Sequence, residues 1–298
     1  MKIKGSFHIY AIIAIVFWSL AYVFTRLALK YFSPYSLGFS RYLVASGTLI
    51  IFVIKAKMGP PKKSDYGWFI IGGAIGFFLY MIAFNKGSET ITASTSSVII
   101  STAPILTALL ANLFYKERLK IYQWAAIFIS FLGVIVLTIL NGKFMIGGGM
   151  VWIFFASVLV SLYNILQRKL TKTYSALQST AYCIFMGTIM LSVFLPVTLG
   201  EVKSAPAIQI FYIVILGVFS SAIAYLAWAQ ALAKAKYTSY VSNYMFATPF
   251  LTTLLGLIIA KEIPDFSAII GGAIILAGLF VFNFGGKWGQ KPIKKPGS

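Results

Sequence analysis

The sequence contains very few charged residues. Among its 298 residues only 10% are charged and 59% are hydrophobic, and the mean hydropathy is +0.88. Water-soluble domains contain about 25% charged residues, so most of this chain must be surrounded by lipid. The scarcity of charge therefore excludes a soluble fold.

Acidic residues, histidine and cysteine are scarcer still. The one cysteine, Cys183, has no intrachain partner, so a disulfide is excluded. The one histidine is His8, and the six acids all fall in loops or at predicted helix ends: Asp65, Glu89, Glu117, Glu201, Glu262 and Asp265. A membrane-embedded enzyme needs an activated nucleophile with its base, or a metal cluster, and this set can supply neither. We therefore predict no catalytic residue, metal or cofactor, and the sequence leaves proton or ion coupling undecided.

Positive charge is in excess, but it is dispersed. The net charge is +19, with Lys and Arg in small groups between apolar runs, whereas a nucleic-acid-binding face would gather them on one surface. With the N-terminus in the cytoplasm, cytoplasmic segments hold 18 Lys and Arg residues and external segments hold six. The positive-inside rule thus predicts cytoplasmic termini. Residues 286–298 then form a basic cytoplasmic tail, and no nucleic-acid partner is expected.

Long apolar runs fill the rest of the chain. A helix needs about 20 apolar residues to cross a bilayer. Runs of this kind fall at 7–29, 35–55, 66–85, 91–115, 121–140, 147–167, 177–199, 207–232, 237–260 and 266–284. The sequence therefore predicts an all-α membrane protein of ten transmembrane helices, with membrane lipid around it.

The two halves of the chain match each other. Pro104 aligns with Pro249, Glu117 with Glu262 and Gly133 with Gly278 at an offset of 145, and Ser19 aligns with Ser161 and Arg26 with Arg168 at an offset of 142. The matches predict a five-helix repeat over 1–143 and a second over 144–285. Because five is odd, the second repeat enters the membrane from the opposite side. Inverted repeats are typical of alternating access; a duplication kept only for folding is the alternative.

These features resemble a known family. The marks are Trp18-Ser19, Arg41, the pattern from Ser94 through Pro104 to Lys116-Glu117-Arg118-Leu119, and Gly133, which recur as Pro249, Lys261-Glu262 and Gly278. The sequence resembles the drug/metabolite transporter superfamily, and within it the ten-helix EamA-type carriers that include an aromatic amino-acid exporter. Ile263-Pro264 replaces Arg118-Leu119 in the second half, so that loop is not a copy. The resemblance implies a multi-pass carrier of a small-molecule solute in the cell (inner) membrane, and leaves the solute unnamed.

Polar stripes and prolines mark the segments that face inward. Ser94, Ser97, Ser101 and Pro104 share one helical face, and Ser239, Ser242 and Pro249 repeat it. Each proline removes a helical hydrogen bond, so Pro104 and Pro249 are predicted hinges beside a cavity. The alternative is that the small residues serve only close helix packing.

Amide and hydroxyl groups are interleaved with aromatic rings along several predicted spans and at the ends of others. The predicted substrate-binding residues are Trp18, Tyr22, Tyr80, Asn85, Ser97, Asn164, Tyr225, Trp228, Gln230, Asn243 and Tyr244. Such a set suits a zwitterionic or aromatic solute, whose polar ends form hydrogen bonds while its flat parts stack. Arg41 could hold a carboxylate or phosphate, or extend to the interface. Gly72 and Gly76 predict a packing groove, within the bundle or between subunits, so monomer and homodimer both remain open.

The sequence as a whole predicts a secondary transporter rather than an enzyme. We expect it to move an amino acid or related metabolite by alternating access, with export favoured. The alternative is a channel or a non-transporting membrane scaffold. Saturable flux that is stimulated by solute on the opposite side distinguishes a carrier from both.

Overall fold

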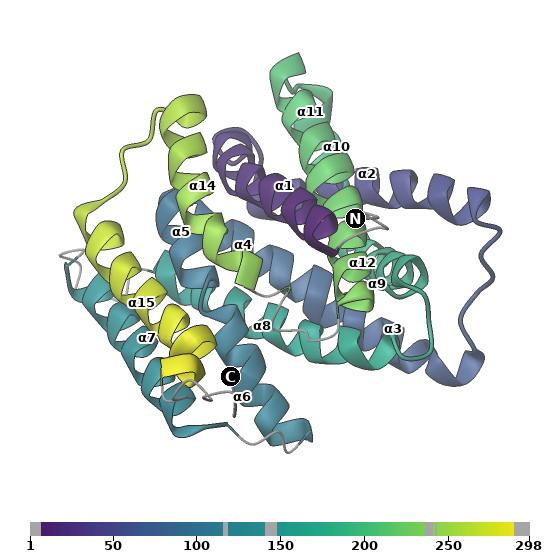
Figure 1. Ribbon diagram of the computed structural model, residues 1–298. Coiled ribbons are helices and arrows are strands. Elements are labelled where there is room, and N and C mark those ends of the chain that lie inside the picture. Colours follow the sequence, from purple (N-terminus) through teal and green to yellow (C-terminus); the bar gives the residue numbers. More distant parts are fainter. Residues whose placement is uncertain (1–6, 116–118, 141–147, 236–240, 242, 289–298) are drawn as a thin grey trace.

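A computed structural model describes residues 7–115, 119–140, 148–235, 241 and 243–288 (Figure 1). Nearly all of these residues are helical, and none of them forms a strand. Glu117, Ser239, Ser242 and most of the predicted tail, as well as the side chain of Asn243, lie outside the described residues. The all-α prediction holds for the described part of the chain.

The first half consists of helices that follow the predicted apolar runs. They are α1 (Phe7–Ala28), α2 (Pro34–Lys55), η1 (Lys63–Asp65), α3 (Tyr66–Gly73), η2 (Ala74–Leu79), α4 (Tyr80–Ser88), α5 (Ala93–Ile100), α6 (Ala103–Tyr115) and α7 (Ile121–Leu140). The η2 segment is π-helical and joins α3 to α4. The Ser33 hydroxyl caps α2 by accepting a hydrogen bond from the Ser36 N–H, and Pro34 occupies the first helical position.

The second half repeats this plan. Its elements are α8 (Gly148–Leu170), α9 (Ala176–Leu191), η3 (Ser192–Phe194), α10 (Leu195–Lys203), α11 (Ala207–Val214), η4 (Ile215–Ile223), α12 (Ala224–Lys234), η5 (Asn243–Phe246), α14 (Ala247–Leu255), η6 (Gly256–Ala260) and α15 (Phe266–Trp288). The Ser175 hydroxyl caps α9 as Ser33 caps α2, at the repeat offset of 142. The η4 segment is also π-helical and occupies the position equivalent to η2.

Seven helical segments are long and apolar enough to cross a membrane. They are Phe7–Ala28, Pro34–Lys55, Lys63–Ser88, Ala93–Phe114, Gly148–Leu170, Ala176–Lys203 and Ala207–Lys234. Three shorter apolar helices accompany them: Ile121–Val136, Ala247–Ala260 and Phe266–Phe282. Large apolar side chains such as Ile54, Leu113 and Ile121 project outward from the bundle, as expected where lipid replaces water.

Helices from opposite halves pack against each other in equivalent pairs. Helix α1 of the first half contacts α12 and α14 of the second half. Helix α8, the repeat equivalent of α1, contacts α4 and α6 of the first half. The helices α2 and α9, which are also equivalents, contact each other. Figure 1 shows α7 and α15 lying side by side at one edge of the molecule. Helices α1 and α8 therefore each pack against helices of the opposite half.

The contact between α7 and α15 depends on two glycines. A Cβ atom added to Gly133 would lie 2.7 Å from the backbone nitrogen of Ile275, and one added to Gly278 would lie 2.8 Å from that of Ser130. Ser130 and Ile275 are themselves repeat equivalents, and the Ser130 hydroxyl donates to the Ile275 carbonyl at 3.2 Å. Neither glycine can carry a side chain without separating the two helices.

We expect Gly133→Ala to lower the stability of the purified protein. The added methyl group meets backbone atoms of α15, and overpacking of this kind costs about 1–3 kcal/mol. Thermal unfolding in detergent measures the change. Gly47→Ala in α2 is the matched control, because a Cβ atom there meets nothing within 4 Å. An equal loss of stability in both variants would contradict the packing role of Gly133.

Gly72 and Gly76 pack within the bundle. A Cβ atom on Gly72 would lie 2.6 Å from the Cys183 sulfur in α9, and one on Gly76 would lie 2.7 Å from the Cγ atom of Tyr163 in α8. These contacts place the groove formed by the two glycines between helices of one chain. They explain why the small residues are needed without invoking a second subunit.

Candidate functional site

A cavity lies between helices of the two halves. Its volume is about 60 Å³, which is room for a few water molecules and is smaller than the ~300–1,000 Å³ of typical small-molecule sites. Helices α1, α2, α4, α5, α8, α9, α12 and α14 contribute to its wall. Six of the predicted binding residues line it: Trp18, Tyr22, Tyr80, Asn164, Tyr225 and Trp228.

Aromatic rings form much of the cavity wall. The Trp18 ring of α1 lies 5.0 Å from the Trp228 ring and 5.2 Å from the Tyr225 ring of α12, measured between ring centroids. On another side of the cavity, Tyr80 stacks on Phe84 at 5.7 Å. Edge-on and tilted rings at these distances stabilise each other. The rings of Trp18, Tyr225 and Trp228 thus join the two halves and present flat apolar surfaces to the cavity.

Several residues that line the cavity carry buried polar atoms without a hydrogen-bond partner among the described residues. The Gln167 amide nitrogen donates to the hydroxyls of Ser179 (3.1 Å) and Thr180 (3.2 Å), whereas its oxygen has no partner among the described residues. The Trp18 indole N–H and the Tyr163 hydroxyl are also buried without a partner among the described residues, and both residues line the cavity. A buried polar group without a partner is costly. A bound solute or water can satisfy these buried atoms only when their side chains turn toward the cavity.

Gln167, Tyr163 and Thr180 were missed by the sequence analysis. Gln167 lies three residues after Asn164 in α8, so the two share one helical face. The Asn164 amide itself donates to the Thr107 hydroxyl at 3.4 Å, across the contact between α8 and α6. A glutamine within an apolar run was a usable signal. Tyr163 and Thr180 gave none, because both residue types are also common in helix packing.

Arg41 lies deep in the wall formed by α2. Only 4% of its surface is exposed, and its Nε–H donates to the Ser221 hydroxyl at 2.6 Å. The side chain lines the cavity instead of extending to the interface. None of the described acidic residues lines the cavity with it. The cavity therefore contains a fixed positive charge without a described negative partner.

The predicted hinge prolines each follow a break in a helix. Helix α5 ends at Ile100, and Ser101 and Thr102 form a turn before α6 begins one residue ahead of Pro104. In the second half the 3-10 segment η5 ends one residue before α14, which contains Pro249. The cavity is lined by Ser101 in the first of these segments and by Met245 in η5. Their role as hinges stays a prediction.

Four other predicted binding residues lie away from the cavity lining. Asn85 is fully buried and donates to the Pro34 carbonyl at 2.8 Å, and the Ser97 hydroxyl donates to the Ser94 carbonyl at 2.7 Å. Tyr244 shares a hydrogen bond with the imidazole of His8, and Gln230 is partly buried in α12. The side chain of Asn243 lies outside the described residues.

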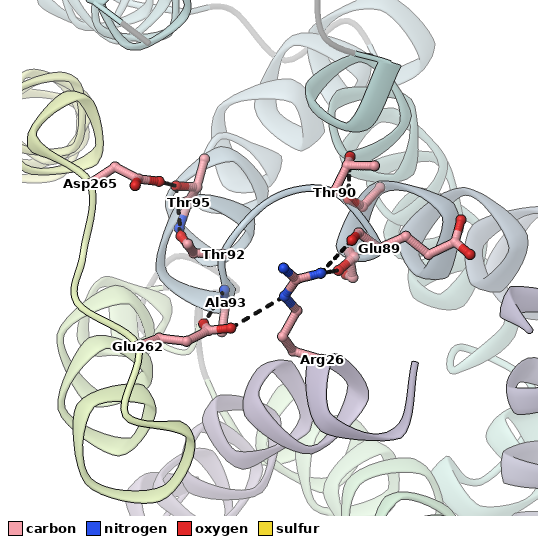
Figure 2. A network of polar contacts seen from close by, with 10 residues as sticks. Arg26, Glu89, Thr90, Thr92, Ala93, Thr95, Glu262 and Asp265 are labelled. Carbon is pink, nitrogen blue, oxygen red and sulfur yellow. Dashed lines mark hydrogen bonds and ion pairs between the residues drawn. The ribbon is translucent and has the colours of Figure 1, made fainter. Parts of the chain in front are cut away.

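A second polar cluster joins the two halves (Figure 2). The Arg26 Nε–H donates to a Glu262 carboxylate oxygen at 3.2 Å, and Nη1 donates to the carbonyls of Ser88 (3.0 Å) and Glu89. The other Glu262 oxygen accepts from the backbone N–H of Ala93 at 3.1 Å. We call this cluster the Arg26–Glu262 clamp.

The Arg26–Glu262 clamp lies near the cavity, because Arg26 and the lining residue Trp18 belong to the same helix, α1. Arg26 follows Trp18 by eight residues in α1, a rise of about 12 Å. Beside the clamp, the Thr95 hydroxyl donates to Asp265 at 3.4 Å, so a second contact joins α5 to the segment before α15. Figure 2 shows both contacts linking the start of α5 to this segment. The two halves are thus fastened together by both contacts.

Comparisons with known proteins agree with this architecture. The EamA-like transporter family matches residues 5–139 and again residues 147–284. The uncharacterized transporter YdfC of Bacillus subtilis is 30% identical, with 88% of this chain and 86% of that protein covered. A probable terminal-alkyne amino-acid exporter of Streptantibioticus cattleyicolor is 26% identical, with 91% of each covered. A solved crystal structure matches the fold with a TM-score of 0.63 at 19% identity, over 93% of this chain and 97% of that one.

Proposed function

Because the chain belongs to the EamA-like transporter family and is a multi-pass membrane protein, we propose that it is a secondary carrier that exports an amino acid or a related metabolite. All ten apolar helical segments span the membrane in this proposal, as two inverted units over 1–143 and 144–285. A relative named as a probable amino-acid exporter supports the solute class and the direction.

The observation that carries the proposal is the position of the cavity. It lies where α1 meets α12 and where α8, the repeat equivalent of α1, meets α4. A site at the contact between repeats can be exposed to either side when the repeats rock against each other. The lining combines aromatic faces with amide and hydroxyl groups, which suits a small solute that is partly polar and partly flat. The predicted binding residues in the cavity wall act as contacts for this solute.

The Arg26–Glu262 clamp supports a gated cavity. In the predicted topology Arg26 and Glu262 lie at the external end of their helices, while the cavity extends along α8 from Val160 to Gln167, toward the predicted cytoplasmic end. The clamp therefore closes the external side in the described conformation. Release of the clamp, with bending at Pro104 and Pro249, opens the external side during export.

Efflux from intact cells tests this function. Cells that overproduce the chain are loaded with labelled amino acids, one at a time, and the release of label is followed after dilution. We expect faster release than from cells without the chain for at least one amino acid, with saturation at high internal concentration. Equal release for every amino acid, with the chain shown to be folded in the membrane, would overturn amino-acid export.

A further inference from the structure

The positive charge of Arg41 is placed where a folded membrane protein rarely leaves one. A buried charge is costly unless it is paired, and ionisable groups inside membrane spans usually face a partner or a functional cavity. Arg41 is 4% exposed, and among the described residues its side chain forms one hydrogen bond, to the neutral hydroxyl of Ser221. Its two terminal nitrogens make no hydrogen bond or ion pair with any described residue. The Nε edge of the guanidinium group is therefore held by Ser221, and the edge formed by the two terminal nitrogens has no partner among the described residues.

The described acidic residues are all occupied elsewhere. Each has a different partner: Asp65 accepts from Tyr174, Glu89 pairs with Lys86, Glu201 accepts from the Ser33 N–H, Glu262 pairs with Arg26, and Asp265 accepts from Thr95. None of the five lines the cavity. The protein thus supplies no described counter-charge to Arg41, and an anionic group entering the cavity would supply it.

We propose that Arg41 binds the carboxylate of the transported solute, and that the solutes are monocarboxylates with an apolar or aromatic body. The proposal rests on the carrier function given above. A guanidinium group pairs with a planar carboxylate through two parallel N–H donors, and the open terminal nitrogens of Arg41 provide such donors. A phosphate monoester brings up to two negative charges, whereas Arg41 is the one cationic residue among the described residues that line the cavity. The aromatic wall around Trp18 and Trp228 accommodates the body of the solute.

The other end of an amino acid meets only neutral groups. The Gln167 amide oxygen is an acceptor without a partner among the described residues, and the faces of Trp18, Tyr225 and Trp228 can receive a cation weakly. The cavity therefore requires the carboxylate and tolerates loss of the ammonium charge. This asymmetry distinguishes Arg41 as a specificity-determining residue from an arginine that only supports the fold.

Binding to the purified chain tests the assignment without any transport. The probes are phenylalanine, leucine, their N-acetyl derivatives, which keep the carboxylate, and their amides, which keep only the ammonium group. Equilibrium dialysis of labelled probes against protein in detergent gives the affinities. We expect the free and N-acetylated acids of at least one series to bind, and the matching amide to bind about 10- to 100-fold more weakly, because it loses a charged hydrogen-bonded pair.

Variants of Arg41 and Ser221 separate recognition from folding. Arg41→Gln should weaken carboxylate binding about 10- to 100-fold and abolish the preference for the acid over the amide, whereas Arg41→Lys should retain part of both. If Arg41→Gln does not fold, Ser221→Ala, which frees the Nε edge of Arg41, should reduce the preference several-fold. Amides that bind wild-type protein as well as acids, no binding of any carboxylate, or an undiminished preference in these variants would overturn the assignment. Carboxylate binding without flux would contradict the carrier function and leave the assignment intact.

Discussion

Glu262→Gln is expected to raise the rate at which an external thiol reagent labels a cysteine in the cavity by about 5- to 30-fold. The substitution removes the charge that holds Arg26 and weakens the acceptor of the Ala93 N–H. The side chains of the Arg26–Glu262 pair are only 28% and 21% exposed. Loss of a partly buried charged contact costs roughly 1–2 kcal/mol, so the open state becomes correspondingly more populated.

The labelling experiment uses Ala21→Cys as the reporter. Ala21 lines the cavity from α1, and the one native cysteine, Cys183, is buried. A membrane-impermeant reagent is added to intact cells, and chain without the reporter gives the background. Glu89→Gln is the matched control, because Glu89 pairs with Lys86 within its own segment at 3.8 Å. Unchanged labelling in Glu262→Gln, or an equal rise in Glu89→Gln, would show that the clamp does not gate the cavity.

Val160→Phe is expected to abolish most transport while leaving the fold intact. Val160 lines the cavity from α8, so the larger ring occupies space that a solute would need. A solute forced to bind beside it is overpacked by about 1–3 kcal/mol, which corresponds to roughly 5- to 150-fold weaker binding. The free protein loses little, because the ring enters existing space. Flux assays and thermal unfolding together measure the two effects.

Val151→Phe is the control for this prediction. Val151 lies in the same helix, α8, and is 50% exposed on the outer surface of the bundle. The same ring added there should change neither flux nor unfolding temperature. If Val160→Phe transports normally, the cavity is not the route of the solute. If it fails to fold, the space near Val160 is already filled, and the cavity assignment loses its support.

Helix positions were predictable because lipid imposes a simple pattern. The predicted runs 7–29 and 35–55 correspond to α1 (Phe7–Ala28) and α2 (Pro34–Lys55) to within one residue at each end. The π-helical segments η2, η4 and η6 were not predicted, because an apolar run is compatible with both α and π hydrogen bonding. The breaks before Pro104 and Pro249 were anticipated as kinks, since proline removes a backbone donor wherever it occurs.

For the candidate site, residue type could indicate which side chains face the interior of the bundle, but not which of them line the cavity. Trp18, Tyr22 and Asn164 lie in the cavity wall, and their contact with a solute stays a prediction. Asn85 has the same character, yet its amide donates to the carbonyl of Pro34, a contact made 51 residues away in the sequence. A single sequence shows that a buried amide needs a partner, but it does not show which partner the fold provides.

The pairing of Arg26 with Glu262 could not be predicted from the sequence either. Both residues are repeat marks in the sequence; Arg26 was counted among the external positive charges, and Glu262 was placed among the acids in loops or at helix ends. Their pairing joins positions 236 residues apart, which requires the packing of α1 against α14. Helical periodicity gives the face of one helix, whereas the contact between two helices depends on side chains from both.

Counterflow in liposomes tests the central claim most directly. Purified chain is reconstituted with a high internal concentration of one unlabelled amino acid, and entry of a trace of the same labelled compound is followed, together with Val160→Phe as the inactive variant. An alternating-access carrier should show saturable uptake that rises well above equilibrium and then decays, and the variant should show little. Uptake that never exceeds equilibrium, that does not saturate, or that is the same in both proteins would contradict a carrier with its site in this cavity.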